Sequence, residues 1–387
     1  GRGFFEIVVD GQKRKIGITR AHLEEDAGKL IHPPGKNYSL VDYNRAGVPL
    51  LEIVSEPDIR SATEARIYLQ SLQNIMRYLG VSDADMEKGH LRCDANISLR
   101  KTGEEGFPPY KVEVKNMNSF KAVANAIDSE IQRQTVILEA GDTPVQETRG
   151  WHDAKEITFS QRIKEEAHDY RYFPEPDLPP LRHSAEFINN IKAEIPELPQ
   201  SRRERLQQEY GLLSAEIEIF VLDKGLGEYF EKVVSEFPSN LAKENLLKLI
   251  KIASNYLITD LKALMNGRSV ADKNFLIIPE DFSEFTQLIY EGKISSKMAK
   301  IILREMFLTG ADPSHIIEEK GLSQISDESE IEKIVKDIIL QNLKSVEDFK
   351  KGKTGVLQFL MGQALIKSRG KANPAIVEKV FRRLLTE

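Results

Sequence analysis

Carboxylate side chains that could take part in chemistry are grouped most clearly on two predicted strands. In residues 91–100 a period of two places Arg92 and Asp94 on one side and apolar residues on the other. In the next predicted strand, Glu113 and Lys115 alternate with valines. We therefore expect Asp94 and Glu113 to share one polar face of a sheet.

Two further stretches place carboxylates where a solvated surface does not require them. The segment HLEEDAGK contains Glu25 close to a glycine, and the segment LEIVSEPD carries Glu52 among apolar residues. Acidic side chains interleaved with Lys and Arg suit a divalent cation and a phosphorylated ligand, because Mg²⁺ takes oxygen ligands and basic groups bind phosphate oxygens. A half-buried sheet that presents charges only to water gives the same pattern. Spacing alone leaves both interpretations open.

Other chemistries lack the residues that they need. Cys93 is the single cysteine, so an intramolecular disulfide and a zinc site built from several thiolates are excluded. The sequence contains neither a P-loop nor a Gly-x-Ser-x-Gly segment. These observations argue against nucleophilic hydrolase chemistry.

The elements that would position the carboxylates are short strands and two helices. Strand signals occur at 4–9, 91–99 and 110–115. One helix signal starts with a capping box at Ser61, and the other begins near Asn118. Strands interrupted by helices indicate an α+β fold with a largely antiparallel sheet.

The composition changes at residues 174–180, which contain four prolines in seven residues. Such a segment cannot lie in a helix or a central strand, so it predicts a rigid, extended connector. From Ala185 onward almost every segment has helical periodicity, which is interrupted at Pro313 and again near 321–329. We expect a helical domain and then a compact set of short helices.

Length and composition are typical of a multidomain globular protein. A chain of 387 residues with 41% hydrophobic and 29% charged residues predicts two or three domains. The longest apolar runs are far below the roughly 20 residues of a membrane-spanning helix, so we expect a soluble protein without a membrane partner. The hairpin signal that starts at Phe4 suggests that the chain begins inside a domain.

The net charge of −6 hides an asymmetry between the body and the tail. Residues 344–387 contain ten Lys or Arg against four Asp or Glu. A basic tail fits RNA binding, because neutralising phosphates requires Lys and Arg. A solvated helical surface is the other interpretation.

Several segments, in their order along the chain, resemble the family of B subunits of the tRNA-dependent amidotransferases. The resemblance covers essentially the whole chain, and several of the matching motifs exceed eight residues. The segments that carry it are HLEEDAGK, LVDYNRAGVPLLEIVSEPDIR, DMEKGHLRCDANISLR, EVKNMNSF, QETRGW, DYRYFPEPDLPPL, IPELPQSRRERL, SSKMAK and SVEDFKKGKTGVLQFLMGQALIKSRGKANP.

The resemblance implies a three-part organisation. Residues 1–184 would form an α+β cradle domain that holds the active site. Residues 185–320 would form an all-α helical domain, and 321–387 an all-α YqeY-like tail that binds tRNA. In this tail, Lys350, Lys351, Lys353 and Lys371 are the candidates for contact with phosphate.

The resemblance also implies the reaction of a carbon–nitrogen ligase that uses glutamine as amide donor. With ATP and Mg²⁺, the B subunit phosphorylates the side-chain carboxylate of Glu-tRNA(Gln) or Asp-tRNA(Asn). Ammonia from the glutaminase A subunit then displaces the phosphate. The expected partners are this A subunit, a small C subunit in a heterotrimer, and the misacylated tRNA. The expected location is the bacterial cytoplasm, or an organellar matrix in a eukaryote.

Matching the family motifs assigns candidate roles to particular residues. Glu25 and Glu113 are the candidate catalytic carboxylates, and together with Asp94 and Glu52 they are the candidate metal ligands. Arg92 and Lys115 are the candidates for contact with the phosphates of ATP.

The family also has about a hundred N-terminal residues, with further metal-facing Glu and His side chains, that this sequence does not contain. We therefore expect the chain to lack its N-terminal start and to be inactive alone. The rival interpretation is a noncatalytic, tRNA-binding scaffold protein. A paralogous archaeal protein is disfavoured, because helical patterns fill the region where its inserted domain would lie.

Overall fold

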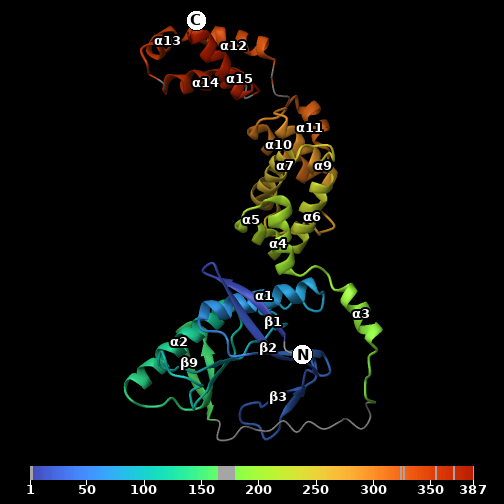
Figure 1. Ribbon diagram of the computed structural model, residues 1–387, viewed down its shortest axis with the longest axis vertical. Helices are drawn as coiled ribbons and strands as arrows, with labels where there is room; N and C mark the ends of the chain where they lie inside the picture. Colours follow the sequence, from blue (N-terminus) through green and yellow to red (C-terminus); the bar gives the residue numbers. More distant parts are fainter. Residues whose placement is uncertain are drawn as a thin grey trace. The chain divides into compact units, whose positions relative to one another are not determined.

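The computed structural model describes residues 3–163, 179–322, 325, 327–353, 355–368 and 371–386. The chain divides into two compact units, Gly1–Leu198 and Pro199–Glu387 (Figure 1). The first unit mixes sheets and helices, the second is helical, and about half of the chain is helical. In the described residues, no helix is both long enough and apolar enough to cross a membrane.

The strands of the first unit form three sheets. One sheet has the order β1-β2-β5, a second ladder pairs β3 with β4, and a four-stranded sheet has the order β6-β7-β8-β9. All pairs are antiparallel except β7 with β8, which run parallel. The sheets are thus largely antiparallel, as predicted. The strands are β1 (Gly3–Val9), β2 (Gln12–Glu25), β3 (Lys29–Ile31), β4 (Leu40–Asp42), β5 (Pro49–Ser55), β6 (Ala95–Ile97), β7 (Val112–Lys115), β8 (Glu147–His152) and β9 (Ile157–Ile163).

Two long helices pack against each other and against these strands. Helix α1 (Ala62–Tyr78) contacts α2 (Phe120–Glu139) and β1, and α2 contacts β6 and β9 (Figure 1). Their apolar faces share one core with the inward side chains of the first and the four-stranded sheet, among them Ile16, Val112 and Val114. One layer of helices therefore covers one face of these strands and leaves the other face open.

The local signals at the two helix starts are largely confirmed. The Ser61 hydroxyl accepts a hydrogen bond from the backbone N–H of Glu64 at 3.1 Å, and Ser119 caps α2 in the same way. The Glu64 carboxylate accepts from the backbone N–H of Arg60 at 2.6 Å. A capping box would instead bring it to the N–H of Ser61, so only the Ser61 half of the predicted motif is present.

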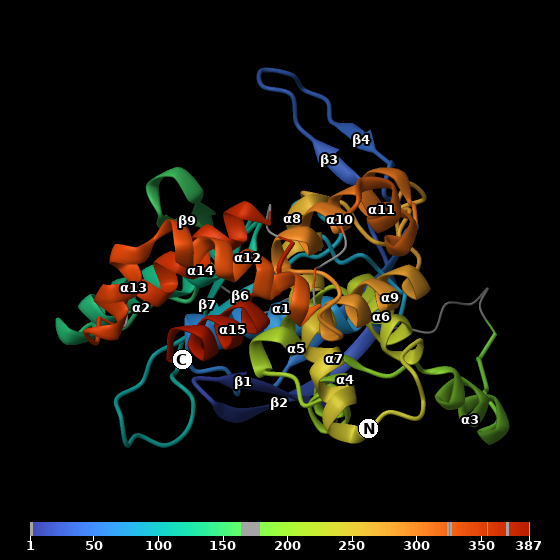
Figure 2. The same cartoon turned by 90° about the horizontal axis from the view of Figure 1, so that it is seen from above.

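The predicted strand at 91–99 is too long. Only Ala95–Ile97 forms a strand, and the residues before it are irregular. Conversely, β2 extends to Glu25 and is longer than its hairpin signal indicates. The β3–β4 hairpin that follows projects from the first unit (Figure 2), and all of β3 is exposed.

The second unit contains two hydrophobic cores. Residues Leu206 to Ile316 contribute one core, and residues Ile331 to Leu385 contribute the other. Most of the predicted proline connector lies outside the described residues, and the three-domain division stays a prediction. Short helices η1 (Asp153–Lys155) and α3 (Ala185–Glu194) precede this unit. Its helices are α4 (Pro199–Tyr210), α5 (Ser214–Leu222), α6 (Lys224–Ser235), α7 (Lys243–Tyr256), η2 (Leu257–Leu261), α8 (Lys262–Met265), α9 (Pro279–Tyr290), α10 (Ser296–Thr309), α11 (Pro313–Lys320), α12 (Glu328–Gln341), α13 (Leu343–Lys350), α14 (Gly355–Lys367) and α15 (Pro374–Thr386).

Candidate functional site

A lysine ammonium lies between two of the predicted carboxylates on the polar face of the four-stranded sheet. Lys115 Nζ is 2.7 Å from Asp94 Oδ2 and 3.4 Å from Glu113 Oε1. Thr148 Oγ1 donates a hydrogen bond of 3.0 Å to Glu113 Oε2. We call these four residues the Asp94 cluster. The structure thus brings Asp94, Glu113 and Lys115 together, as the strand periodicity predicts.

Strand pairing explains why these side chains meet. Glu113 lies opposite Asn96 on β6 and opposite Thr148 on β8. Its neighbours Val112 and Val114 are fully buried, so alternation turns Glu113 and Lys115 to the face that the helices leave open. The cluster therefore lies on three adjacent segments of one rigid sheet.

The environment of Lys115 keeps its ammonium charged. Partial burial lowers the pKa of this lysine, but the hydrogen bond and charge of Asp94, followed by those of Glu113, outweigh that effect. The net result is a raised pKa. The cluster therefore presents a fixed positive charge between two carboxylates.

A buried ionic network lies on the helix side of the same sheet. Glu130 of α2 is fully buried, and its carboxylate is 2.9 Å from Arg133 Nη2 and 3.0 Å from Arg149 Nε of β8. Gln134 and Thr158 donate further hydrogen bonds to it. Burial alone would raise the pKa of Glu130, but the Arg133, Thr158 and Gln134 hydrogen bonds lower it.

This network holds β8 against α2. Arg149 points toward Glu130, whereas the preceding residue, Thr148, points toward Glu113. A register irregularity separates these two residues in the β8–β9 pairing. The buried network therefore fixes the strand that supplies Thr148 to the Asp94 cluster.

A second ionic group lies where β2 ends. Asp26 Oδ2 is 2.9 Å from Arg45 Nε and 3.0 Å from Arg92 Nη2. We call these three residues the Asp26 group. The side chain of Asp26 is only 10% exposed, whereas those of Arg45 and Arg92 are 45% and 58% exposed. Two accessible guanidinium groups thus share one nearly buried carboxylate.

The two remaining predicted carboxylates lie on the β2–β5 ladder. Glu52 pairs with His22 in register, and its carboxylate accepts from Arg20 at 2.8 Å. Glu25 pairs with Pro49, three positions further along. Since side chains alternate along a strand, this odd separation turns Glu25 and Glu52 to opposite faces of the ladder. The structure does not bring them together.

The donors of the Asp94 cluster fit one kind of Mg²⁺ site. Mg²⁺ usually keeps several waters and takes one or two protein carboxylates with substrate phosphates. Asp94 and Glu113 supply two such carboxylates, and a cation, the Lys115 ammonium, already lies between them. In the described part of the chain, however, no three His, Cys, Asp or Glu side chains are grouped so that they could hold a metal ion. The four metal ligands predicted from the sequence are therefore not brought together in one site.

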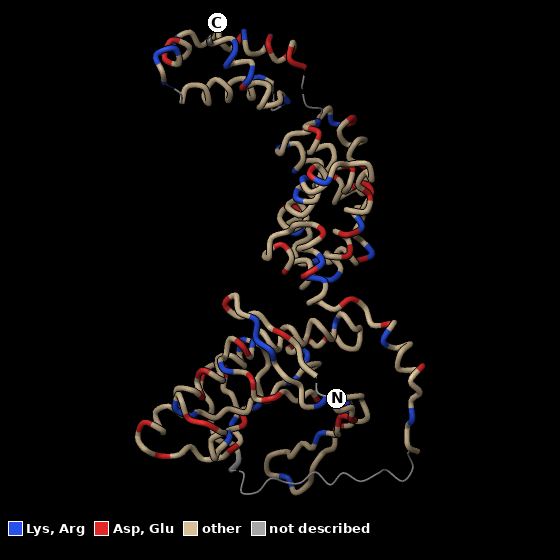
Figure 3. The backbone as a smooth tube through the Cα atoms, viewed as in Figure 1, with Lys and Arg blue, Asp and Glu red and all other residues tan. Residues whose placement is uncertain are grey.

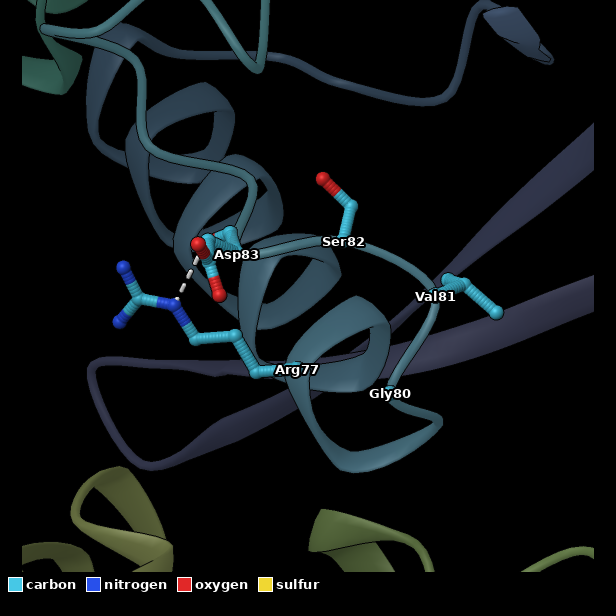
Figure 4. Close-up of a pocket in the computed structure, with 5 residues that line it drawn as sticks. All are labelled: Arg77, Gly80, Val81, Ser82 and Asp83. Carbon is cyan, nitrogen blue, oxygen red and sulfur yellow. Dashed lines mark hydrogen bonds between the residues drawn. The ribbon is translucent and has the colours of Figure 1, made fainter. Parts of the chain in front are cut away.

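Two other features of the first unit do not extend the site. Cys93 packs against the core, and burial, helped by the charge of Asp94, raises the pKa of its thiol to about 12. A shallow hollow after α1 is lined by Arg77, Val81 and Asp83 with their neighbours Gly80 and Ser82 (Figure 4). Arg77 Nε donates there to the Asp83 carbonyl at 2.7 Å. The hollow is small and open, and none of its lining residues belongs to the Asp94 cluster or the Asp26 group.

Of the predicted tRNA-binding lysines, Lys350 ends α13, whereas Lys351, Lys353 and Lys371 lie between helices of the C-terminal region, along which Lys and Arg recur (Figure 3). Lys350 and Lys351 are exposed at the end of α13. Lys353 is exposed and pairs with Asp348 at 3.1 Å. Lys371 is partly buried and precedes α15. The four therefore do not share one exposed stretch of helix.

Three residues of the Asp94 cluster and the Asp26 group are not predicted from the sequence. Asp26 lies beside Glu25 in the same acidic motif, and Arg45 lies in the segment NRAGVPL. Thr148 lies in QETRGW. Each of these motifs stands out in the sequence, but only the pairing of β2 with β5 and of β7 with β8 indicates which of their residues turn toward the site.

Comparisons with known proteins cover most of both units of the chain. Residues 1–189 match the family model described as the GatB/GatE catalytic domain, and residues 228–385 match the one described as the GatB domain. Both ionic groups lie in the first match, so the first unit belongs to a class of catalytic domains.

Individual relatives carry the same assignment. Proteins named as the B subunit of aspartyl/glutamyl-tRNA(Asn/Gln) amidotransferase, from Persephonella marina, Carboxydothermus hydrogenoformans and Thermotoga maritima, are 49%, 47% and 46% identical to this chain. The matches cover 99%, 98% and 99% of this chain and 78%, 77% and 78% of those relatives. The chain therefore belongs to the family of B subunits of the aspartyl/glutamyl-tRNA(Asn/Gln) amidotransferases. The matches leave about a fifth of each relative's length uncovered, and the expectation of about a hundred missing N-terminal residues stays a prediction.

Proposed function

We propose that this chain is the component of a tRNA-dependent amidotransferase that activates the amino acid on misacylated tRNA. Its substrate would be Glu-tRNA(Gln) or Asp-tRNA(Asn), its phosphoryl donor ATP with Mg²⁺, and its nitrogen source ammonia from a glutaminase A subunit. The observation that carries the proposal is the Asp94 cluster, a lysine held between two carboxylates inside the part of the chain that matches a catalytic domain.

The reaction requires activation because a carboxylate is a poor acyl donor. In the first step, a side-chain carboxylate oxygen forms a bond to the γ-phosphorus of ATP while the bond from this phosphorus to the β–γ bridging oxygen breaks, and ADP leaves. In the second step, the ammonia nitrogen bonds to the acyl carbon, the bond to the phosphate oxygen breaks, and a proton passes from nitrogen to the released phosphate. The product is an amide.

The residues of the site suit the charge that moves in the first step. Catalysis of phosphoryl transfer is mainly positioning and electrostatic stabilisation. The Lys115 ammonium would donate to phosphate oxygens, Asp94 and Glu113 would hold it in place, and Thr148 would fix the Glu113 carboxylate. When bound by Asp94 and Glu113, Mg²⁺ would neutralise phosphate charge.

The proposal extends to the partners of the reaction. The relatives are named as a B subunit, which supports assembly with an A subunit and, in our proposal, a small C subunit. Glu25 and Glu52 stay predicted metal ligands, Arg92 a predicted phosphate ligand, and the tail lysines predicted tRNA contacts.

The proposal is tested by ADP release in the assembled amidotransferase, in the presence and absence of Glu-tRNA(Gln). Removing one preorganised electrostatic group from an active site costs on the order of 100-fold or more in rate. We therefore expect E113Q and D94N to lower tRNA-dependent ADP release by about this factor. E6Q is the matched control, because Glu6 pairs with Lys13 at 3.6 Å on the β1–β2 hairpin. Unchanged turnover in both E113Q and D94N would instead favour a noncatalytic, tRNA-binding scaffold.

A further inference from the structure

The Asp26 group has the arrangement of an anion-binding site whose positive charge is only partly neutralised. Arg45 and Arg92 both approach the same oxygen of Asp26, so their guanidinium groups lie close enough to bind one ligand together. One carboxylate neutralises only one of two guanidinium groups, so the group keeps a net positive charge. About half of each arginine side chain remains accessible.

Backbone geometry holds Arg45 in this position. The N–H of Asp26 donates to the carbonyl of Val48 at 2.8 Å, and the N–H of Gly47 donates to the carbonyl of Asp26 at 3.0 Å. These bonds close the turn that contains Arg45 against the end of β2. Arg45 Nη1 also donates to the carbonyl of Gly89 at 3.2 Å. Arg92 follows Gly89 by three residues, so it comes from a segment that Arg45 itself contacts.

Gly89 is needed where Arg45 approaches. Its φ of 72° lies in the left-handed region, which favours glycine. A Cβ at this position would lie 3.4 Å from Arg45 Nη1. That distance is ordinary van der Waals contact, so the backbone turn, and not crowding by Arg45, requires a glycine here.

The Asp26 group adjoins the Asp94 cluster along the chain. Arg92 precedes Asp94 by two residues, and the intervening Cys93 packs against the core. Arg92 and Asp94 both lie in the irregular segment that leads into β6, and a separation of two residues keeps their Cα atoms within about 7 Å of each other. Arginines that bind an anion here would hold it next to Lys115, which Asp94 contacts at 2.7 Å.

We propose that Arg45 and Arg92 together bind the polyphosphate of ATP and that Asp26 is the positioning residue that aligns them. This inference rests on the proposed function and adds Arg45 and Asp26 to it. Guanidinium groups match phosphate oxygens in planar, bidentate pairs. Two of them held by one carboxylate suit the closely spaced charges of a polyphosphate better than the single charges that are spread along a nucleic acid backbone.

The test measures binding of a non-hydrolysable ATP analogue with Mg²⁺ by titration calorimetry, with the chain assembled in the amidotransferase. We expect R45M and R92M each to weaken binding about tenfold or more, because each variant loses charged hydrogen bonds to the phosphates. R45K should fall between wild type and R45M, because lysine keeps the charge but lacks the planar fork. Inorganic tripolyphosphate should compete with the analogue in the wild type and much less in R45M.

R14M is the matched control. Arg14 is also in the first unit, its side chain is 55% exposed, and it pairs with Glu64 at 3.7 Å. Its loss should leave nucleotide affinity unchanged. Melting temperatures near that of the wild type would show that the variants fold, as expected for accessible side chains.

The outcomes separate this inference from the proposed function. Wild-type nucleotide affinity in both R45M and R92M would overturn the inference and leave the proposed function standing. The same would follow if the two variants bound tRNA more weakly but ATP normally. If the wild-type complex itself failed to bind the ATP analogue, the proposed function and the inference would both be wrong.

Discussion

Lys115 Nζ lies 2.7 Å from Asp94 Oδ2, although Asp94 precedes the strand β6 and Lys115 ends its neighbour β7. The contact joins two segments of one sheet on the face that the helices leave open. A lysine in this position can serve either as a structural counter-ion or as a donor to phosphate. These two roles predict different results when the ammonium is removed.

Replacing Lys115 with methionine separates the two roles. The side chain is 39% exposed, so loss of the ion pair should change the free energy of unfolding by no more than about 1 kcal/mol. If the ammonium stabilises moving phosphate charge, tRNA-dependent ADP release should fall on the order of 100-fold. K13M is the control, because Lys13 pairs with Glu6 at 3.6 Å on the same unit. Equal activity in K115M and wild type, with only stability affected, would contradict a role in the reaction.

Periodicity in the sequence was sufficient to predict that Asp94, Glu113 and Lys115 lie together, but it predicted neither Thr148 nor the Asp26 group. Alternation along the strands turns Glu113 and Lys115 to the side opposite the buried valines, and local pattern contains that information. Asp26 meets Arg45 and Arg92 only because β2 continues beyond its hairpin and a turn closes against its end. Such contacts depend on register between distant segments, which a single sequence does not specify.

Register between distant strands also decides which acids of the motif HLEEDAGK can reach the site. The sequence indicates three acids in a row, from Glu24 to Asp26, but not which of them turns toward the polar face. Register with β5 puts Glu25 and Glu52 on opposite faces. The helices were predicted more closely, because a cap such as Ser61 is a local signal.

The buried carboxylate of Glu130 should contribute strongly to stability. E130Q keeps the shape of the side chain but removes one of the two buried carboxylates that Arg133 and Arg149 share, the other being Glu147. Removing one partner of a buried pair costs about 3–5 kcal/mol, so urea unfolding should show a loss of this order. The control is E378Q, since Glu378 forms an exposed pair with Arg382 at 2.7 Å within α15 and should change stability by less than about 0.5 kcal/mol. Similar losses in both variants would contradict the assigned network.

Glu130 should also make stability depend on pH in the acid range. Its pKa in the folded protein lies below the ordinary value of 4.5. The stability that it contributes is therefore fully present above the unfolded-state pKa and is lost as the pH falls through the folded-state pKa. Below pH 4.5, the free energy of unfolding of the wild type should fall more steeply than that of E130Q. Parallel curves for the two proteins in this range would show that Glu130 does not titrate as proposed.

Packing of the second unit can be tested with two glycines that lie in helices. A Cβ on Gly227 of α6 would clash with the carbonyl oxygen of Phe220, whereas one on Gly362 of α14 would meet nothing within 4 Å. G227A should therefore destabilise the protein by about 1–3 kcal/mol through overpacking. G362A should stabilise it by about 0.5–1 kcal/mol through helix propensity. Thermal unfolding measures both, and a stabilised G227A would contradict the close approach of α5 and α6.

The tail lysines predict how tRNA binding depends on salt. Lys350 and Lys351 are exposed at the end of α13, and each lysine that neutralises a phosphate contributes about 0.7–0.9 to the slope of log affinity against log salt. K350M/K351M should therefore weaken tRNA binding at low salt and flatten this slope by up to about 1.4–1.8. K13M/K101M removes the same number of exposed lysines from the first unit and serves as the control. A slope that changes equally in both double variants would reflect the overall charge of the protein, and an unchanged slope in K350M/K351M would show that these lysines do not contact phosphate.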